Sequence, residues 1–211
     1  MLAAKKSGAA TAADNKIKIL FVTGNENKKK EVQQIMGEQF QVDSLAIDLP
    51  ELQGEIDEIS KEKCRIAIQN VLTDPKIAYK YGSEHVIVVE DTSLCFNALN
   101  GMPGPYIKWF LEKCGHEGLN KMLVEWEDDC CDDGCGCCGE VELDLNPKVI
   151  RGETTGDIVL PRSAEGPAFG WDPIFQPTGF TQTFAEMTKE QKNTISHRYK
   201  AFQALQAALL E

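Results

Sequence analysis

Four short stretches of the chain, far apart in sequence, carry side chains that can bind a polyanion, a metal ion or an aromatic base. They are residues 23–29, 90–92, 169–173 and 196–198. Together they contain lysines that can bind phosphate, carboxylates that can hold a divalent metal, an aromatic surface and a basic group beside it. Each stretch alone is a weak indication. In combination they are the parts of a site that cleaves a nucleotide.

The first stretch joins an apolar strand, predicted over residues 16–22, to a helix predicted from about Lys28. Thr23, Gly24 and Asn25 have turn chemistry. The free N–H groups at the start of a helix bind phosphate, and Lys28 adds a full charge there. The stretch lacks the Gly-x4-Gly-Lys spacing of a Walker A motif. The alternative interpretation is a surface turn followed by a solvated basic face.

Glu90 and Asp91 directly follow a short apolar strand predicted over residues 86–89. The carboxyl end of a strand is the usual place for a site in an α/β sheet. Because neighbouring strand residues point to opposite faces, one of the two carboxylates is expected to be structural. Asp91 is the candidate metal ligand and the base that orients water. Glu51 is the candidate second ligand for Mg²⁺, and an ordinary loop carboxylate is its alternative interpretation.

Lys63 and Lys108 could meet phosphates from two predicted helices. A lone helical lysine is usually a solvated one. Lys108, however, lies between Tyr106 and Trp109, just after a rigid Pro-Gly-Pro turn. This setting favours a binding role for Lys108.

The stretch at residues 169–173 has the composition of a loop that holds a base. Phe169 offers an aromatic face, Gly170 permits close approach, and Asp172 can hydrogen-bond around the base. Trp171 could equally be a core residue. His197 and Arg198 open the last predicted helix, and Lys192 precedes them. A plain helix start is the alternative interpretation of His197.

Apolar periodicity indicates an α/β architecture of alternating strands and helices. Strands are predicted over residues 16–22, 40–49 and 86–89, and two more over 149–160. Helices are predicted from about residue 28, over 60–72 with Ser60 as N-cap and Leu72 on the apolar face, from about 106, over 118–126 and over 197–210.

These motifs, and above all residues 90–111 (EDTSLCFNALNGMPGPYIKWFL), resemble the inosine triphosphate pyrophosphatase family and its eukaryotic branch. The resemblance runs from about Ile17 to about Leu205. The family hydrolyses non-standard purine nucleoside triphosphates to the monophosphate and pyrophosphate. The resemblance implies two lobes around an elongated mixed β-sheet with flanking helices and a cleft between the lobes. It also implies Mg²⁺, for which Mn²⁺ can substitute, and a homodimer.

The resemblance also assigns roles to single residues. It places triphosphate binding at Thr23, Asn25, Lys28, Lys63 and Lys108. It matches His197 and Arg198 to residues that read the 6-oxo group of a purine. A 6-oxo group accepts hydrogen bonds where the 6-amino group of adenine donates them, so donors at this point disfavour adenine. Attack of water at the α-phosphorus is likewise implied by the family.

Length and composition suit one domain, predicted over residues 16–211, preceded by a disordered tail over residues 1–15. Apolar residues make up 42% of the 211 residues. No apolar run approaches the ~20 residues of a membrane-spanning helix. The tail lacks both an apolar signal core and the arginines of a transit peptide. The expected protein is cytoplasmic and does not bind a membrane.

The charge is unevenly spread. The formal net charge of −11 argues against a nucleic-acid partner. Nine acidic residues and no Lys or Arg lie between Glu125 and Asp144, so the rest of the chain has 33 − 9 = 24 acids against 22 bases. A nearly neutral protein that binds a polyanion must concentrate its positive charge locally or use a divalent metal.

Residues 127–140 depart from the family pattern, which has a strand of small and apolar residues here. Five of the eight cysteines lie between Cys130 and Cys138, among glycines and aspartates that make a poor central strand. Three interpretations remain open. The segment is a flexible acidic loop that leaves the sheet one strand short, a soft-metal site built on Cys131, Cys135 and Cys138, or a misread reading frame.

The sequence therefore predicts a magnesium-dependent pyrophosphatase that acts on ITP, dITP and XTP. Two alternatives stay open. One is a non-enzymatic metal-binding or scaffold protein on a decayed fold of this family. The other is a pyrophosphatase for other modified nucleotides, such as methylated pyrimidines. The intact lysines, carboxylates and His-Arg pair favour an enzyme.

Overall fold

The computed structural model describes residues 16–82, 84–124, 130–131, 137–140, 147–163 and 169–210. The tail predicted over residues 1–15 lies outside this part of the chain. For residues 130–131 and 137–140 the description covers the backbone alone.

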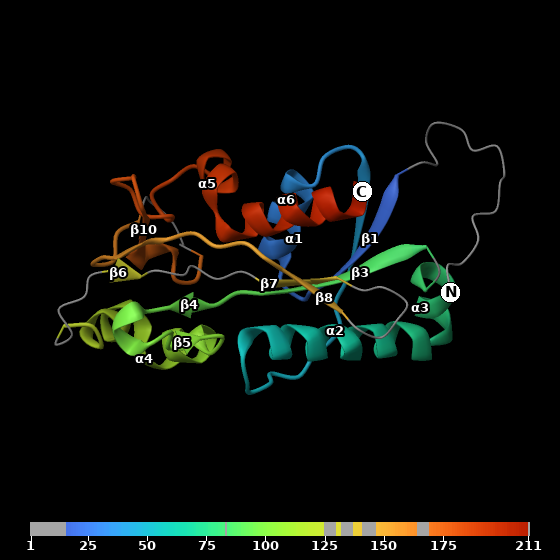
Figure 1. The fold of residues 1–211 in the computed structure, drawn as a ribbon, viewed down its shortest axis with the longest axis horizontal. Helices are drawn as coiled ribbons and strands as arrows, with labels where there is room; N and C mark the ends of the chain where they lie inside the picture. Colours follow the sequence, from blue (N-terminus) through green and yellow to red (C-terminus); the bar gives the residue numbers. More distant parts are fainter. Residues whose placement is uncertain are drawn as a thin grey trace.

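A mixed five-stranded sheet with the strand order β2-β1-β3-β7-β8 runs through the middle of the elongated molecule (Figure 1). β1 (Ile17–Val22) is parallel to β2 (Phe40–Leu45) and to β3 (His85–Asp91). β7 (Cys137–Glu140) is antiparallel to β3 and to β8 (Lys148–Arg151). The parallel strands β1 and β3 end together, which brings the Thr23 turn beside the end of β3.

Helices α1 (Glu26–Ile35) and α6 (His197–Leu210) cover one face of this sheet, above it in Figure 1. Ile19 and Phe21 of β1 point to this face, because successive strand residues alternate between faces. The rings of Phe21 and Phe202 meet edge to face with centroids 5.9 Å apart. This packing ties the helix that begins at His197 to the central strand.

Helices α2 (Ile56–Thr73) and α3 (Pro75–Tyr81) cover the opposite face. Leu20 and Val22 of β1 point to this side and pack with buried residues of α2, among them Cys64. The central sheet is therefore apolar on both faces, as a sheet covered by helices requires.

The second lobe, at the left of Figure 1, contains two small antiparallel sheets. One has the strand order β10-β9-β6, with β10 Phe175–Pro177, β9 Gly156–Ile158 and β6 Cys130–Cys131. The other pairs β4 (Leu94–Cys95) with β5 (Pro103–Gly104). Along the chain, β4 follows β3 and β9 follows β8, so two strands of the central sheet lead directly into this lobe.

Helices α4 (Ile107–Lys121) and α5 (Lys189–Ile195) and two short 3-10 helices, η1 (Asn97–Leu99) and η2 (Asp172–Ile174), complete this lobe. Its core contains Leu94, Phe96, Ile107, Leu119, Ile158, Trp171, Ile174, Phe175 and Phe184. Helix α4 is interrupted at Gly115, whose backbone is non-helical.

Most predicted elements are confirmed, with shifted ends. The predicted Ser60 N-cap is wrong: α2 begins four residues earlier, Glu55 precedes it, and Ser60 is buried inside it. The expectation that Leu72 packs on the apolar face is also wrong, since it is 47% exposed. The second strand ends at Leu45, not at residue 49, and the loop that follows lines the cavity described below. The helix predicted over 118–126 is the second part of α4, up to Lys121.

The loop interpretation of the cysteine-rich segment is contradicted. Residues 137–140 form β7, which pairs with β3 on one side and β8 on the other, and residues 130–131 form β6. Pairing on both sides outweighs the poor intrinsic strand preference of this sequence, because strand stability depends mainly on context. The soft-metal interpretation depends on cysteine side chains that lie outside the described part of the chain.

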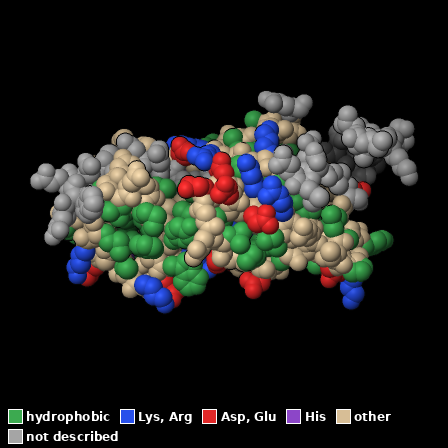
Figure 2. All heavy atoms as spheres, turned by 60° about the horizontal axis from the view of Figure 1, so that its bottom comes forward, with side chains coloured by type: hydrophobic (Ala, Val, Ile, Leu, Met, Phe, Trp, Pro, Cys, Tyr) green, Lys and Arg blue, Asp and Glu red, His purple; other side chains and the backbone are tan. Residues whose placement is uncertain are grey.

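The face formed by α2 and α4 is turned forward in Figure 2. Hydrophobic side chains gather over the half that contains α4, and charged side chains of both signs lie together near the middle. Exposed apolar residues of this region include Met102 and Trp109. None of the helices in the described ranges combines the length and apolar character that a membrane-spanning helix requires.

Candidate active site

A cavity of about 770 Å³ lies where the two lobes meet. Its walls include every residue that the sequence predicts for the site: Thr23, Asn25, Lys28, Glu51, Lys63, Asp91, Lys108, Phe169, Gly170, Trp171, Asp172, Lys192, His197 and Arg198. The volume suits a small-molecule ligand. The cleft expected between the lobes is thus confirmed.

The Thr23 turn is built by its own side chains. The Thr23 hydroxyl accepts a hydrogen bond from the Asn25 backbone N–H at 3.1 Å. Asn25 is the N-cap of α1, and its Oδ1 accepts from the backbone N–H groups of Asn27 at 3.0 Å and Lys28 at 3.2 Å. This differs from the sequence expectation, because these two N–H groups are capped by Asn25. Lys28 also lines the cavity, and its Nζ lies 3.1 Å from Glu90 Oε2.

Asp91 and Glu51 face the same ammonium group. Lys63 Nζ lies 2.8 Å from Asp91 Oδ2 and 3.0 Å from Glu51 Oε2, while Lys108 Nζ lies 2.7 Å from Glu51 Oε1. Burial lowers the pKa of Lys63, but the charge of Asp91 and its hydrogen bond outweigh burial and raise that pKa. Burial raises the pKa of Glu51, but Lys108 and Lys63 outweigh it and lower the pKa. Lys63 and Glu51 are therefore charged at neutral pH.

Tyr106, at the start of α4, is hydrogen-bonded to the loop that contains Glu51. Its hydroxyl accepts a hydrogen bond from the backbone N–H of Gly54 at 3.0 Å and donates to the Gly54 carbonyl at 3.3 Å. The loop belongs to one side of the cavity and α4 to the other. This contact therefore helps to set the distance between Glu51 and Lys108.

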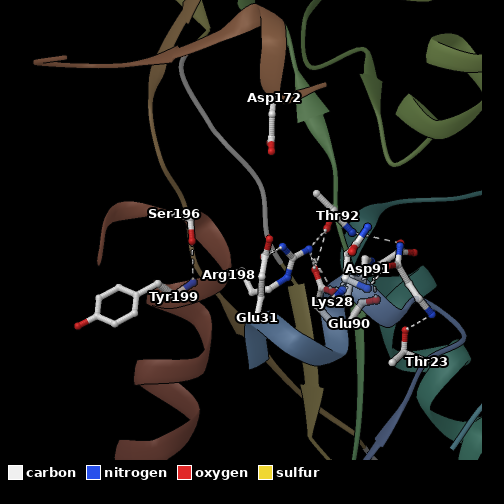
Figure 3. Close-up of polar contacts among 12 residues, drawn as sticks. Thr23, Lys28, Glu31, Glu90, Asp91, Thr92, Asp172, Ser196, Arg198 and Tyr199 are labelled. Atoms are coloured by element: carbon white, nitrogen blue, oxygen red, sulfur yellow. Dashed lines mark hydrogen bonds and ion pairs between the residues drawn. The ribbon is translucent and has the colours of Figure 1, made fainter. Parts of the chain in front are cut away.

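Glu90 faces away from Asp91, as expected for neighbours in a strand. Its side chain is 1% exposed and accepts from Arg198 Nη2 at 3.1 Å and from the Thr92 hydroxyl at 2.7 Å (Figure 3). Lys28 Nζ lies 3.1 Å from its Oε2. Burial raises the pKa of Glu90, but Arg198 and Lys28 outweigh burial and hold the pKa well below its usual range. Glu90 is thus the structural carboxylate of the pair.

Arg198 lies between two carboxylates. One terminal nitrogen pairs with Glu90, and the other with Glu31 of α1 (Figure 3). These two charges outweigh burial and raise the pKa of Arg198. The third guanidinium nitrogen, Nε, is buried and has no hydrogen-bond partner among the described residues.

Lys192 contacts the loop at residues 169–173, which is predicted to hold the base and is called the base loop below. Its ammonium donates to Asp172 Oδ2 at 2.7 Å in a buried pair, lies 3.6 Å from Glu31 Oε1, and sits 5.5 Å from the centre of the Phe169 ring. Burial raises the pKa of Asp172 despite the nearby Lys192 charge. Trp171 is 8% exposed and belongs to the core of the second lobe, which is the alternative foreseen for it.

His197 lies against Trp171, with ring centroids 5.5 Å apart. Burial, together with the positive charge of Arg198, lowers the pKa of His197 well below its usual value, so the imidazole is neutral. Its Nε2 is buried and has no partner among the described residues. An unsatisfied buried ring nitrogen is costly unless a ligand satisfies it.

The start of α6 is held firmly. A Cβ on Gly152 would lie 2.2 Å from the His197 carbonyl oxygen and 2.3 Å from the Ala201 nitrogen, so only glycine allows this approach of chain and helix. The Thr154 hydroxyl donates to the Ile195 carbonyl at 2.7 Å. These contacts fix the direction in which His197 and Arg198 enter the cavity.

Six of these side chains form an alternating series of opposite charges, which we call the charge chain. In order of contact they are Lys28, Glu90, Arg198, Glu31, Lys192 and Asp172. The charge chain runs from Lys28, which follows the Thr23 turn, to Asp172 of the base loop. Each charge in this series therefore has at least one neighbour of opposite charge.

Sequence reasoning missed several residues that build the site. Glu31 joins Arg198 to Lys192, Tyr106 holds the Glu51 loop, and His116 of α4 contacts the Gly170 carbonyl. The spacing of Glu31, one helical turn after Lys28, could have indicated its direction. Nothing local marks His116.

The cavity between the two lobes of this α/β fold has paired carboxylates and lysines at one end, and the Trp171 ring beside one buried histidine nitrogen at the other. This arrangement is the one expected of a nucleoside triphosphate pyrophosphatase. The family follows from the sequence. A family model described as the Ham1 family matches residues 19–208, and the chain belongs to this family.

Solved structures agree with this assignment. A HAM1 protein from Coxiella burnetii superposes with a TM-score of 0.74 at 22% identity, over 92% of this chain and 98% of that one, and shows the fold alone. The Ham1 protein of Staphylococcus aureus has a TM-score of 0.68 at 25% identity, with 91% and 97% covered. A Mycobacterium abscessus protein named nucleoside-triphosphatase / dITP/XTP pyrophosphatase has a TM-score of 0.62 at 25% identity, with 89% and 98% covered.

Proposed function

We propose that this chain hydrolyses ITP, dITP and XTP to the corresponding monophosphate and pyrophosphate. The observation that carries the proposal is His197. Its neutral ring lies against Trp171, and its buried Nε2 has no partner among the described residues. Arg198, whose Nε is also buried without a partner there, lines the same cavity. The name of the Mycobacterium abscessus relative supports the same substrate class.

Base recognition follows from these groups. As Nε2–H, neutral His197 donates a hydrogen bond, and Arg198 is a donor in any state. A 6-oxo purine brings an acceptor to them, whereas adenine brings an amino donor and leaves both nitrogens unsatisfied. Such a mismatch costs a few kcal/mol. Phe169, the first residue of the base loop, supplies the ring on which the purine would stack.

The other end of the cavity would hold the triphosphate. Lys28, Lys63 and Lys108 reach it from three different helices or helix starts. In the described structure Lys63 and Lys108 are paired with carboxylates. Phosphate oxygens would compete for those ammonium groups and neutralise them instead.

The donor set at this end fits a divalent metal. Asp91 and Glu51 are hard oxygen ligands held within reach of one ammonium, and Mg²⁺ takes one or two carboxylates together with substrate phosphates. A bound Mg²⁺ or Mn²⁺ would supply positive charge against the triphosphate oxygens. Asp91 would orient the attacking water toward the α-phosphorus, while the lysines hold the leaving pyrophosphate in line.

The test compares kcat/KM for pyrophosphate release from ITP, XTP and ATP. We expect ITP and XTP to exceed ATP by at least ~100-fold, since a mismatched buried donor is worth a few kcal/mol. Similar values for ITP and ATP would sink the assignment. GTP shares the 6-oxo group, so it tests recognition at the 2-position separately.

We further propose that the protein is a cytoplasmic homodimer and that a single domain spans residues 16–211. The family resemblance supports the dimer. Light scattering coupled to size exclusion tests it, and a monomeric mass would contradict it. The convergence of the predicted site residues on one cavity supports an enzyme over the non-enzymatic scaffold alternative.

A further inference from the structure

Helix α4 carries an unexplained break beside the cavity. Its first part places Lys108 and Trp109 in the cavity wall. At Gly115 the backbone leaves the helix, with φ 64° and ψ −179°. Positive φ is a conformation that L side chains avoid and glycine tolerates. A break that needs a glycine, followed by a resumed helix, suggests that the next residue has a positional task.

That next residue is His116, and it reaches across to the base loop. His116 Nε2 lies 2.8 Å from the carbonyl oxygen of Gly170. A carbonyl oxygen only accepts hydrogen bonds, so Nε2 carries the hydrogen and His116 is the donor. Gly170 also has positive φ, at +55°, and the two elements lie 54 residues apart in sequence.

The contact falls where the base loop is exposed to the cavity. From Trp171 onward the loop is buried, because Trp171 packs in the core and η2 follows. Phe169 and Gly170 are less buried and line the cavity. Lys192 contacts Phe169 from the side of α5, and His116 holds Gly170 from the side of α4.

We propose that His116 is a positioning residue for purine recognition. Its hydrogen bond to Gly170 sets the separation between α4 and the base loop, and thereby the place of the Phe169 ring against the base. This inference rests on the proposed function, because it needs Phe169 to stack on a purine. Among the described residues, no hydrogen bond or ion pair joins His116 to Lys28, Lys63 or Lys108. The break at Gly115 separates His116 from the part of α4 that carries Lys108, so its effect should fall mainly on the base end of the cavity.

The experiment uses the two reaction products as separate probes of the two ends. His116→Ala should raise KM for ITP and weaken inhibition by IMP by about 3- to 10-fold, the range of one net hydrogen bond. Inhibition by pyrophosphate and kcat should stay within about twofold, since the lysines are untouched. His116→Gln, which keeps an N–H donor at similar reach, should recover most of the IMP inhibition.

Glu117→Ala is the matched control, at an exposed position one residue along the same helix. If His116→Ala does not fold, His116→Leu replaces it as a donor-free variant of similar size. Equal loss of IMP and pyrophosphate inhibition would overturn the proposal, as would unchanged IMP inhibition or a Gln variant as weak as the Ala variant. A wild-type protein that does not prefer ITP to ATP refutes the proposed function instead, which the same assays report separately.

Discussion

Asp91 and Glu90 show how two adjacent carboxylates acquire different tasks. Asp91 faces the cavity and Lys63, whereas Glu90 is 1% exposed and paired with Arg198. The alternation of a strand separates them, and the two sides of β3 provide different partners. We therefore expect a charge-removing substitution to act on catalysis at Asp91 and on folding at Glu90.

We expect Asp91→Asn to lower kcat by at least ~100-fold while the melting temperature stays close to that of the wild type, because the shape is kept and the charge that holds metal and orients water is lost. EDTA should abolish wild-type activity, and Mg²⁺ should restore it. Steady-state kinetics with thermal melts measures both. Near-normal turnover of Asp91→Asn would place the catalytic carboxylate elsewhere.

The lowered pKa of His197 predicts how the stability of the fold depends on pH. In the folded state this pKa lies well below the usual 6.5. Below pH 6.5 the unfolded chain therefore binds a proton that the folded protein refuses, so the stability present above 6.5 is lost as pH falls toward the folded pKa. The slope from this group reaches at most ~1.4 kcal/mol per pH unit. Denaturant unfolding between about pH 7.5 and 5.5 should show a shallower decline for His197→Gln. Parallel curves for the two proteins would contradict the assignment.

At the scale of elements, the chain just after β8 can approach α6 because Gly152 has no side chain. Gly152→Ala would place a methyl 2.2 Å from the His197 carbonyl oxygen and must push α6 away. We expect a loss of stability of about 1–3 kcal/mol, together with weaker ITP binding, because His197 and Arg198 move with the helix. Gly37→Ala, where a Cβ meets nothing within 4 Å, is the control for both measurements. A Gly152→Ala variant as stable and active as the Gly37→Ala variant would show that the two elements can separate freely.

The strand β7 gives a second test at this scale. Proline at position 138 removes a backbone N–H from a strand that pairs with Glu90 on one side and Ile150 on the other. Cys138→Pro should lower the melting temperature by about 3–10 °C, whereas Cys138→Ser keeps the N–H and should change it little. Equal melting temperatures for the two variants would restore the loop interpretation.

The sequence predicts the elements whose apolar pattern is strong and the site residues that lie in compact motifs. The strand before Glu90 and the final helix from His197 are both confirmed. β7 could not be predicted from its own residues, although the family pattern has a strand here, because its stability comes from neighbours on both sides. Glu31 was missed for a related reason: its partner Arg198 is 167 residues away.

For the whole molecule, the cavity is built by both lobes, so a ligand that fills it should stabilise the fold as a unit. A non-hydrolysable ITP analogue with Mg²⁺, at about 100 times its dissociation constant, should add ~2.7 kcal/mol. This corresponds to a rise in melting temperature of roughly 5–11 °C for a protein of this size. The matching ATP analogue at the same concentration should give little shift. Equal shifts for both would show binding that does not read the base.

The charge chain bears on how such a protein can change over generations. Its groups are mutually compensated and largely buried, so one substitution strands a neighbouring charge and costs stability before any new preference appears. New base preferences would therefore have to arrive through paired exchanges, such as Glu31 together with Arg198. We expect single-site libraries at these positions to yield mostly unfolded variants. The base preference should therefore change only when two paired residues change together.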